Sequence, residues 1–126
     1  MAQETEIVSE PLAEHFKNVE YEDITPNHRE RFQDLVLDID GYAFAGIGEQ
    51  AYDAALDLIP EVERSDQQAN AIAGGTAPLS DTAFANSLAA HVLTLDDRHC
   101  DSSTHPGSIV VPAALAAGET ADAIGF

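Results

Sequence analysis

The sequence predicts an all-α fold, because most of the chain carries helical signals and only one short stretch leaves room for a strand. Thr25-Pro26 offers an N-cap residue followed by proline at the first helical position, and the run that it opens continues to Gly46. Ser80 is a second N-cap, and Pro112 suits the first turn of a further helix.

The apolar pattern supports the first of these helices. Within 26–46 the apolar residues recur at three- and four-residue steps, which predicts one buried face. We expect that face to consist of Phe32, Leu35, Val36, Ile39 and Ala43. Upstream, we expect residues 1–8 to be disordered and Ser9 to cap a short helix that has Pro11 in its first turn.

The middle of the chain is less regular. Gly46-Ile47-Gly48 predicts a turn, and the apolar side of 51–59 predicts a third helix that ends near Pro60. Residues 61–78 are polar and then glycine-bearing, which predicts a connection with one short strand or turn around 71–73.

The helix that begins at Ser80 should deliver its C-terminal end to a polar loop, 96–105. We expect its buried face to consist of Phe84, Leu88, His91 or Val92, and Leu95. An apolar run then leads into Pro112, where the last helix should begin.

Charge is the most unusual bulk property of these 126 residues. There are 23 Asp and Glu against 5 Lys and Arg, which gives a net charge of -18. Nucleic acid and anionic membranes both require a basic surface, so neither is an expected partner. Self-repulsion of this size is relieved by molar salt, which favours a halophilic protein over the alternative, an ordinary acidic protein.

The length allows one domain. The N-terminus lacks the basic start and apolar stretch of a signal peptide, and no run approaches the roughly 20 apolar residues of a membrane span. Cys100 has no internal partner for a disulfide. We therefore expect a cytoplasmic protein.

The loop 96–105 is where functional groups are densest. On residue types alone, His99, Cys100, Asp101 and His105, joined by His91, offer suitable ligands for zinc or nickel, although their spacing matches no specific zinc pattern. His91 is otherwise expected to be a packed or hydrogen-bonded core histidine. A small metal-binding or interaction module is therefore one alternative for the function.

Three stretches of the chain together resemble the MmgE/PrpD family, which includes 2-methylcitrate dehydratase and cis-aconitate decarboxylase. They are LVLDIDGYAFAG at 35–46, FANSLAAHVL at 84–93 and LDDRHCDSSTHPGSIVVPAALA at 95–116. Their order and spacing agree with the family over nearly the whole chain. The resemblance implies the N-terminal part of a helical domain and a lyase or isomerase acting on small di- or tricarboxylates, without a metal or other cofactor.

The resemblance also implies roles for residues. His105 matches the acid–base histidine, and Asp96 and Asp97 match an acidic pair that orients groups or lines the pocket. Arg98 and His99 are candidates for binding substrate carboxylates. The alternative for Arg98 is an ion pair with Asp96, Asp97 or Asp101. Thr94 and Arg98 stand where the family has Asp and Thr at active-site positions, and this departure argues against activity.

Members of the family are several times longer, so we expect this chain to be an N-terminal fragment that is inactive alone. It would be either a truncated product or one half of a split enzyme. A domain cut through its core exposes apolar helix faces, and we expect a missing C-terminal half or a second copy to cover them.

Overall fold

The computed structural model describes residues 8–57 and 68–121. The expected disorder of residues 1–8 therefore falls, except for residue 8, outside the described residues, and so does the expected helix end near Pro60. The chain divides into two compact units, Met1–Gln33 and Asp34–Phe126, which we describe separately.

The first unit contains α1 (Ser9–Phe16), a 3-10 turn at Tyr21–Asp23 and the start of α2 (Pro26–Gly46). The expected cap at Thr25 is confirmed, because its Oγ1 accepts a hydrogen bond from the His28 N–H at 3.4 Å. The expected cap at Ser9 is wrong. Ser9 is already the first helical residue, and Val8 before it makes no side-chain cap.

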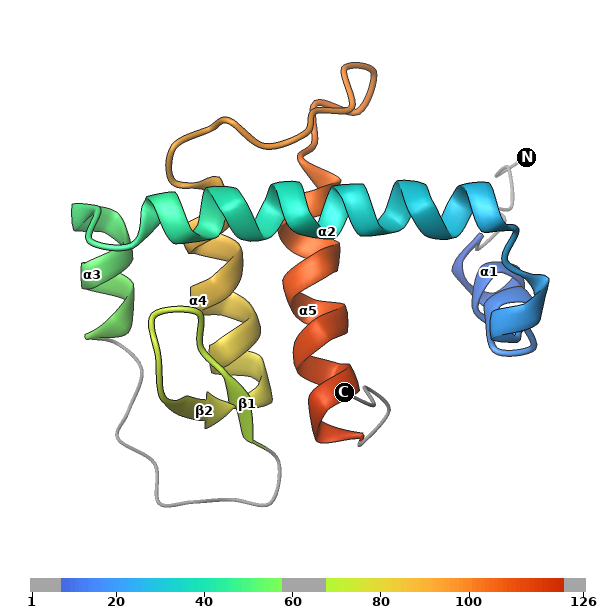
Figure 1. The fold of residues 1–126 in the computed structure, drawn as a ribbon, viewed down its shortest axis with the longest axis horizontal. Coiled ribbons are helices and arrows are strands. Elements are labelled where there is room, and N and C mark those ends of the chain that lie inside the picture. The colour runs from blue at the N-terminus through green and yellow to red at the C-terminus, as the bar shows by residue number, and fades with distance from the viewer. Residues whose placement is uncertain (1–7, 58–67, 122–126) are drawn as a thin grey trace, which may run out of the picture. The chain divides into compact units, whose positions relative to one another are not determined.

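The second unit contains the rest of α2, α3 (Gln50–Leu56), a β-hairpin, α4 (Leu79–His91) and α5 (Pro106–Thr120). Helices α4 and α5 lie side by side, and the hairpin packs against both of them (Figure 1). The hairpin consists of β1 (Gln68–Asn70) and β2 (Thr76–Pro78), with Ala69 opposite Ala77. The described residues are thus predominantly helical, as expected, and 71–73 belong to the hairpin turn.

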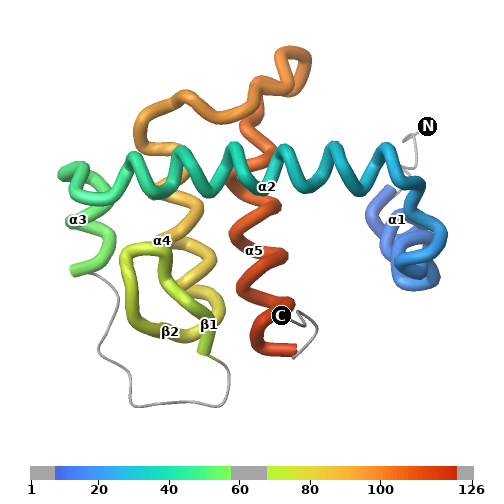
Figure 2. Tube along the Cα trace, in the orientation of Figure 1, coloured from blue at the N-terminus to red at the C-terminus, as the bar shows by residue number. Residues whose placement is uncertain are grey.

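The core of the second unit is rich in alanine. Its buried members are Ile39, Ala43, Tyr52, Ala85, Ala89, Ala90 and Val111. Small side chains let the backbones approach closely: a Cβ at Gly46 would collide with the carbonyl oxygen of Ala89, so α2 meets α4 at a position that only glycine fits. The trace in Figure 2 shows α2 passing across α4 and α5.

Close packing overturns part of the expected apolar pattern. Ile39 and Ala43 are buried as predicted, but Phe32 is exposed. Phe84 on α4 is exposed as well, and so is Leu95, which lies beyond the end of the helix. The buried face of α4 consists of Thr82, Ala85, Ala89 and Ala90. The small residues face the core because α2 and α5 lie too close to α4 for larger side chains at those contacts.

Helix starts also differ from the sequence prediction. Helix α4 begins at Leu79, so Ser80 lies within its first turn. Helix α5 begins at Pro106, six residues before the expected start, and Pro112 is a buried residue inside it. Pro106 occupies the first helical position, where the missing N–H costs no hydrogen bond. Within the part of the chain that the structure describes, no helix is both long and apolar enough to cross a membrane.

Candidate functional site

The candidate site lies where the end of α4 and the start of α5 meet the loop that joins them. Helix α4 ends at His91, and the chain then reverses at Thr94, whose φ of 54° is left-handed. The N–H of Thr94 donates to the carbonyl oxygen of His91 at 2.8 Å. This turn brings Asp96 back against the side chain of His91.

Asp96 is the centre of a cluster that we call the His–Asp–His cluster: His91, Asp96 and His105. The Nδ1 of His91 lies 3.0 Å from each carboxylate oxygen of Asp96, and the Nδ1 of His105 lies 3.3 Å from Oδ1. The two imidazole rings are edge to face, with centroids 4.7 Å apart. One carboxylate therefore faces two imidazoles.

The three side chains differ in exposure. Asp96 is 0% exposed, whereas His105 is 22% and His91 is 44% exposed. Burial pushes the pKa of Asp96 upward, but hydrogen bonds from Ser108 and His91 outweigh it, so the pKa of Asp96 lies below its usual value. Asp96 is thus an ionised carboxylate without solvent contact, and its neighbours are the histidines and the Ser108 hydroxyl.

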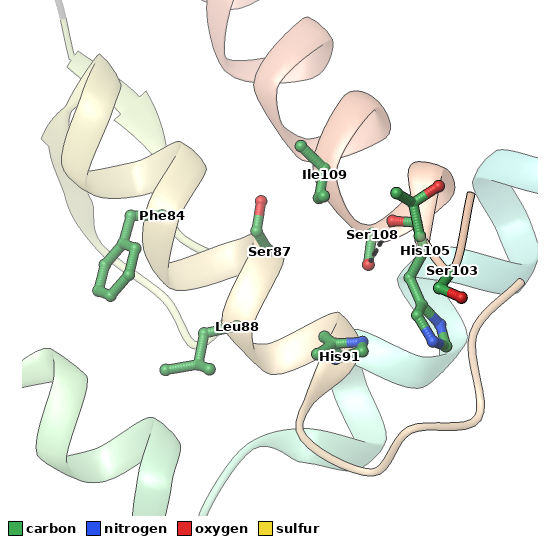
Figure 3. A pocket seen from close by; sticks show the side chains of 9 residues that line it. Phe84, Ser87, Leu88, His91, Ser103, His105, Ser108 and Ile109 are labelled. Atoms are coloured by element: carbon green, nitrogen blue, oxygen red, sulfur yellow. Dashed lines mark hydrogen bonds between the residues drawn. The ribbon is translucent and has the colours of Figure 1, made fainter. Parts of the chain in front are cut away.

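A pocket with a volume of about 410 Å³ adjoins this cluster, because His91 and His105 both line it (Figure 3). That volume falls within the range of roughly 300–1,000 Å³ of small-molecule sites. Both histidines are part of its wall, and its remaining lining combines apolar and hydroxyl side chains: Phe84, Ser87, Leu88, Ser103, Thr104, Ser108 and Ile109. None of the residues described as lining it is Lys or Arg.

Asp97, although adjacent to Asp96, serves a different element. Its Oδ1 accepts a hydrogen bond from the backbone N–H of Gly107 at 2.9 Å, in the first turn of α5. A carboxylate at a helix N-terminus is favoured by the exposed N–H groups and the helix dipole. A Cβ at Gly107 would collide with the Asp97 carboxylate and with Ile39, so any larger residue there would force these two side chains to shift.

The tip of the loop, residues 98–104, is exposed, and its hydrogen bonds join residues of the loop to one another. His99 forms a short antiparallel bridge with Thr104, and its Nδ1 lies 2.8 Å from the Ser102 hydroxyl oxygen. Arg98 and Cys100 are exposed, and Arg98 has no ion pair with the residues described here. The tip therefore presents its polar side chains to solvent.

The structure brings together two of the predicted catalytic residues, His105 and Asp96. Asp97 lies at the start of α5, Thr94 is exposed at the turn, and Arg98 and His99 do not line the pocket. The roles that the family resemblance implies for these residues stay predictions.

The sequence indicated the role of His91 only in part. It was expected to be a packed or hydrogen-bonded core histidine. It is hydrogen-bonded to Asp96, but its side chain is 44% exposed and forms part of the pocket wall. The alternative metal site was expected to combine His99, Cys100, Asp101 and His105 with His91. The structure groups two of these, His91 and His105, and adds Asp96 in place of the others. The available signal was the position of His91 in the last turn of a helix that leads into the loop.

Comparison with known proteins gives one match. The family model described as the MmgE/PrpD N-terminal domain matches residues 10–125. No curated protein and no solved structure matches the chain significantly.

Proposed function

Because the chain belongs to the MmgE/PrpD family, we propose that it is a 2-methylcitrate dehydratase-like lyase domain that acts on small di- and tricarboxylates. In this proposal His105 is the acid–base group and Asp96 orients it. The main support is that the His105 imidazole is part of the pocket wall while its Nδ1 lies 3.3 Å from a buried carboxylate.

This placement suits proton transfer. The Nδ1 of His105 lies 3.3 Å from the negative charge of Asp96, and this charge electrostatically favours the form of His105 that carries its proton on Nδ1, although the contact lacks hydrogen-bond geometry. In that form Nε2, on the opposite side of the ring, has a free lone pair. A carboxylate that fixes the ring and tautomer of a histidine is a recurring arrangement in acid–base catalysis.

The chemistry is an elimination. Nε2 of His105 takes the proton from a carbon next to a substrate carboxylate, and the C–H electron pair becomes the new C=C bond. The C–O bond of the neighbouring carbon breaks, and the departing hydroxide requires a proton to leave as water. His91 is a second imidazole on the same wall and is our candidate for that proton donor.

The described lining of the pocket lacks cationic side chains to bind the carboxylates of the substrate. Di- and tricarboxylates need cationic partners, and the residues described as lining the pocket include no Lys or Arg. We propose that a further polypeptide, either a second copy or a separate chain, supplies them, and that this chain alone is a poor catalyst. Exposed apolar side chains support such a partner: Leu37, Phe44, Ile109 and Val110.

The test is dehydration of 2-methylcitrate in molar KCl, followed by the absorbance of the unsaturated product. Slow activity is measured by NMR as deuterium exchange at the substrate carbon in D₂O. We expect His105→Gln to lower either rate at least about 100-fold, and the exposed-residue control His28→Gln to leave it unchanged. Equal rates for the wild-type chain and His105→Gln would contradict the proposal.

The partner proposal has its own measurement. Sedimentation velocity in molar KCl should show self-association, and co-incubation with the chain that supplies the cations should raise the rate. A persistent monomer that already turns over 2-methylcitrate rapidly would refute the need for a partner.

A further inference from the structure

The His–Asp–His cluster has the spacing of a metal site. One ligand-type atom from each of His91, Asp96 and His105 can be chosen so that all three lie within 4.8 Å of one another. The shortest nitrogen–oxygen distances are 3.0 and 3.3 Å. Tetrahedral zinc, with bonds of roughly 2.0–2.1 Å, separates neighbouring ligand atoms by about 3.3 Å. The side chains therefore need only small movements to bind an ion.

The donor set fits a particular class of ion. Two imidazoles and one carboxylate suit Zn²⁺ and related divalent transition metals, whereas Mg²⁺ and Ca²⁺ prefer sites made entirely of oxygen. Asp96 contributes a buried negative charge, and the whole chain has a net charge of -18. The C-terminal end of α4, which carries His91, also favours a nearby cation.

One atom of the cluster lacks a partner. The Nδ1 of His105 is buried and makes no hydrogen bond to the residues described here, because its 3.3 Å contact with Asp96 does not meet hydrogen-bond geometry. Buried polar nitrogens normally have a partner. An ion held between this nitrogen and Asp96 would provide one.

From these observations we infer that His91, Asp96 and His105 form a binding site for one divalent transition-metal ion of the zinc class. Both histidines are part of the wall of the 410 Å³ pocket. Three protein ligands leave a fourth coordination position for water or an anionic ligand from the pocket, as in zinc sites that are open to substrate.

The inference goes beyond the proposed lyase function and does not rest on it. When a metal occupies Nδ1 of neutral His105, the ring proton resides on Nε2, which then has no lone pair to accept a substrate proton. Metal binding and acid–base chemistry at His105 therefore exclude each other, and we expect Zn²⁺ to inhibit the lyase.

The experiment measures binding, so it does not depend on activity. The chelator-stripped chain in molar KCl is titrated with Zn²⁺ by calorimetry, and with Co²⁺ while the visible absorption of tetrahedral Co²⁺ is recorded. We expect one ion per chain, unaffected by excess Mg²⁺. His91→Gln and His105→Gln should each weaken binding at least about tenfold, and both should reduce the tetrahedral Co²⁺ spectrum.

The matched control is the double variant His99→Gln/Cys100→Ser at the exposed tip of the loop, which should bind as the wild type does. Circular dichroism checks each fold. If His105→Gln unfolds, His91→Gln decides the result, because the His91 side chain is 44% exposed and its replacement disturbs packing less.

Three outcomes would overturn the inference: no saturable one-to-one binding, equal affinity in the wild type and both histidine variants, or loss of binding in the tip variant. Zinc binding together with equal deuterium-exchange rates in the wild type and His105→Gln would leave this inference standing and count against the proposed function. Dehydration without zinc binding would support the proposed function and overturn this inference.

Discussion

The base and the tip of the loop between α4 and α5 are built from similar residue types but differ in structure. At the base, His91, Asp96 and His105 converge around a carboxylate that is 0% exposed. At the tip, the four successive residues 98–101 are exposed. Charges and imidazoles interact strongly only where water is excluded. The density of reactive residues in the sequence therefore did not indicate where they cooperate.

Replacing the central carboxylate should give the largest effect. We expect Asp96→Asn to lower the free energy of unfolding by about 2–4 kcal/mol, because it removes one member of a buried charged network and leaves its partners unpaired. Urea denaturation in molar KCl measures it. Asp101→Asn at the exposed tip is the control, and equal losses for both variants would abolish the distinction between base and tip.

The close contact at the start of α5 should rank second. We expect Gly107→Ala to cost about 1–3 kcal/mol, because its Cβ would displace the Asp97 carboxylate from the Gly107 N–H and push against Ile39. Gly41→Ala on α2 is the matched control. No atom lies within 4 Å of a Cβ there, so Gly41→Ala should stabilise the helix by up to about 1 kcal/mol. If both variants changed the free energy of unfolding in the same direction, the close contact at Gly107 would not explain the loss.

The turn at Thr94 should be strained, since a β-branched residue is unfavourable at a φ of 54°. Asparagine tolerates this conformation, so Thr94→Asn should raise stability by up to about 1 kcal/mol. Thermal melting gives the comparison. Ser103→Asn repeats the change at the tip, where φ is 53°, and should give a gain of the same sign. A loss at Thr94 alone would show that its side chain has a structural role at the base.

Asp40 on α2 provides a carboxylate with the opposite shift from that of Asp96. Burial raises the pKa of Asp40, so its ionised form is less stable in the folded chain than in the unfolded chain. The cost is absent below the unfolded pKa of about 3.9 and develops as pH rises to the folded value. Asp40→Asn should therefore stabilise at pH 7 by less than about 1 kcal/mol, discounted for solvent screening.

Denaturation of Asp40→Asn and the wild type between pH 3 and pH 7 measures this difference. The gain should shrink as pH falls. A gain that grows toward acid pH would show that Asp40 has a stabilising partner when it is ionised.

The smallest effects should come from the tip. His99→Gln and Cys100→Ser should each change stability by less than about 0.5 kcal/mol, because both side chains are exposed and their contacts are local. Thermal melting in molar KCl tests both. A large loss in either variant would mean that the tip contributes to the folded state as the base does.

Prediction from sequence succeeded where local chemistry decides the outcome. Thr25 and Pro26 define the start of α2 because a side-chain acceptor and a fixed φ act within one turn. The predicted starts of α4 and α5 were wrong because several residues are suitable caps, and contacts with other parts of the chain determine which position begins the helix. Asp97, ten residues before Gly107, is one such contact at α5.

The apolar pattern failed for a related reason. Phe84 and Leu95 recur at helical spacing, but the closest contacts of α4 require small residues, so Ala85 and Ala89 are buried instead. Hydrophobicity ranks residues by their transfer from water, whereas helix packing also selects them by size.

The sequence by itself determined the helical class, the acidic character and the family motif that contains Asp96 and His105. These features depend on composition, short-range spacing and local capping. Only the tertiary structure decided that Asp96 is buried between two histidines, that Asp97 accepts a hydrogen bond from α5, and that His91 contacts Asp96 and not the tip of the loop. Their arrangement depends on how closely α2, α4 and α5 pack, and this distance is set by contacts between residues far apart in the chain.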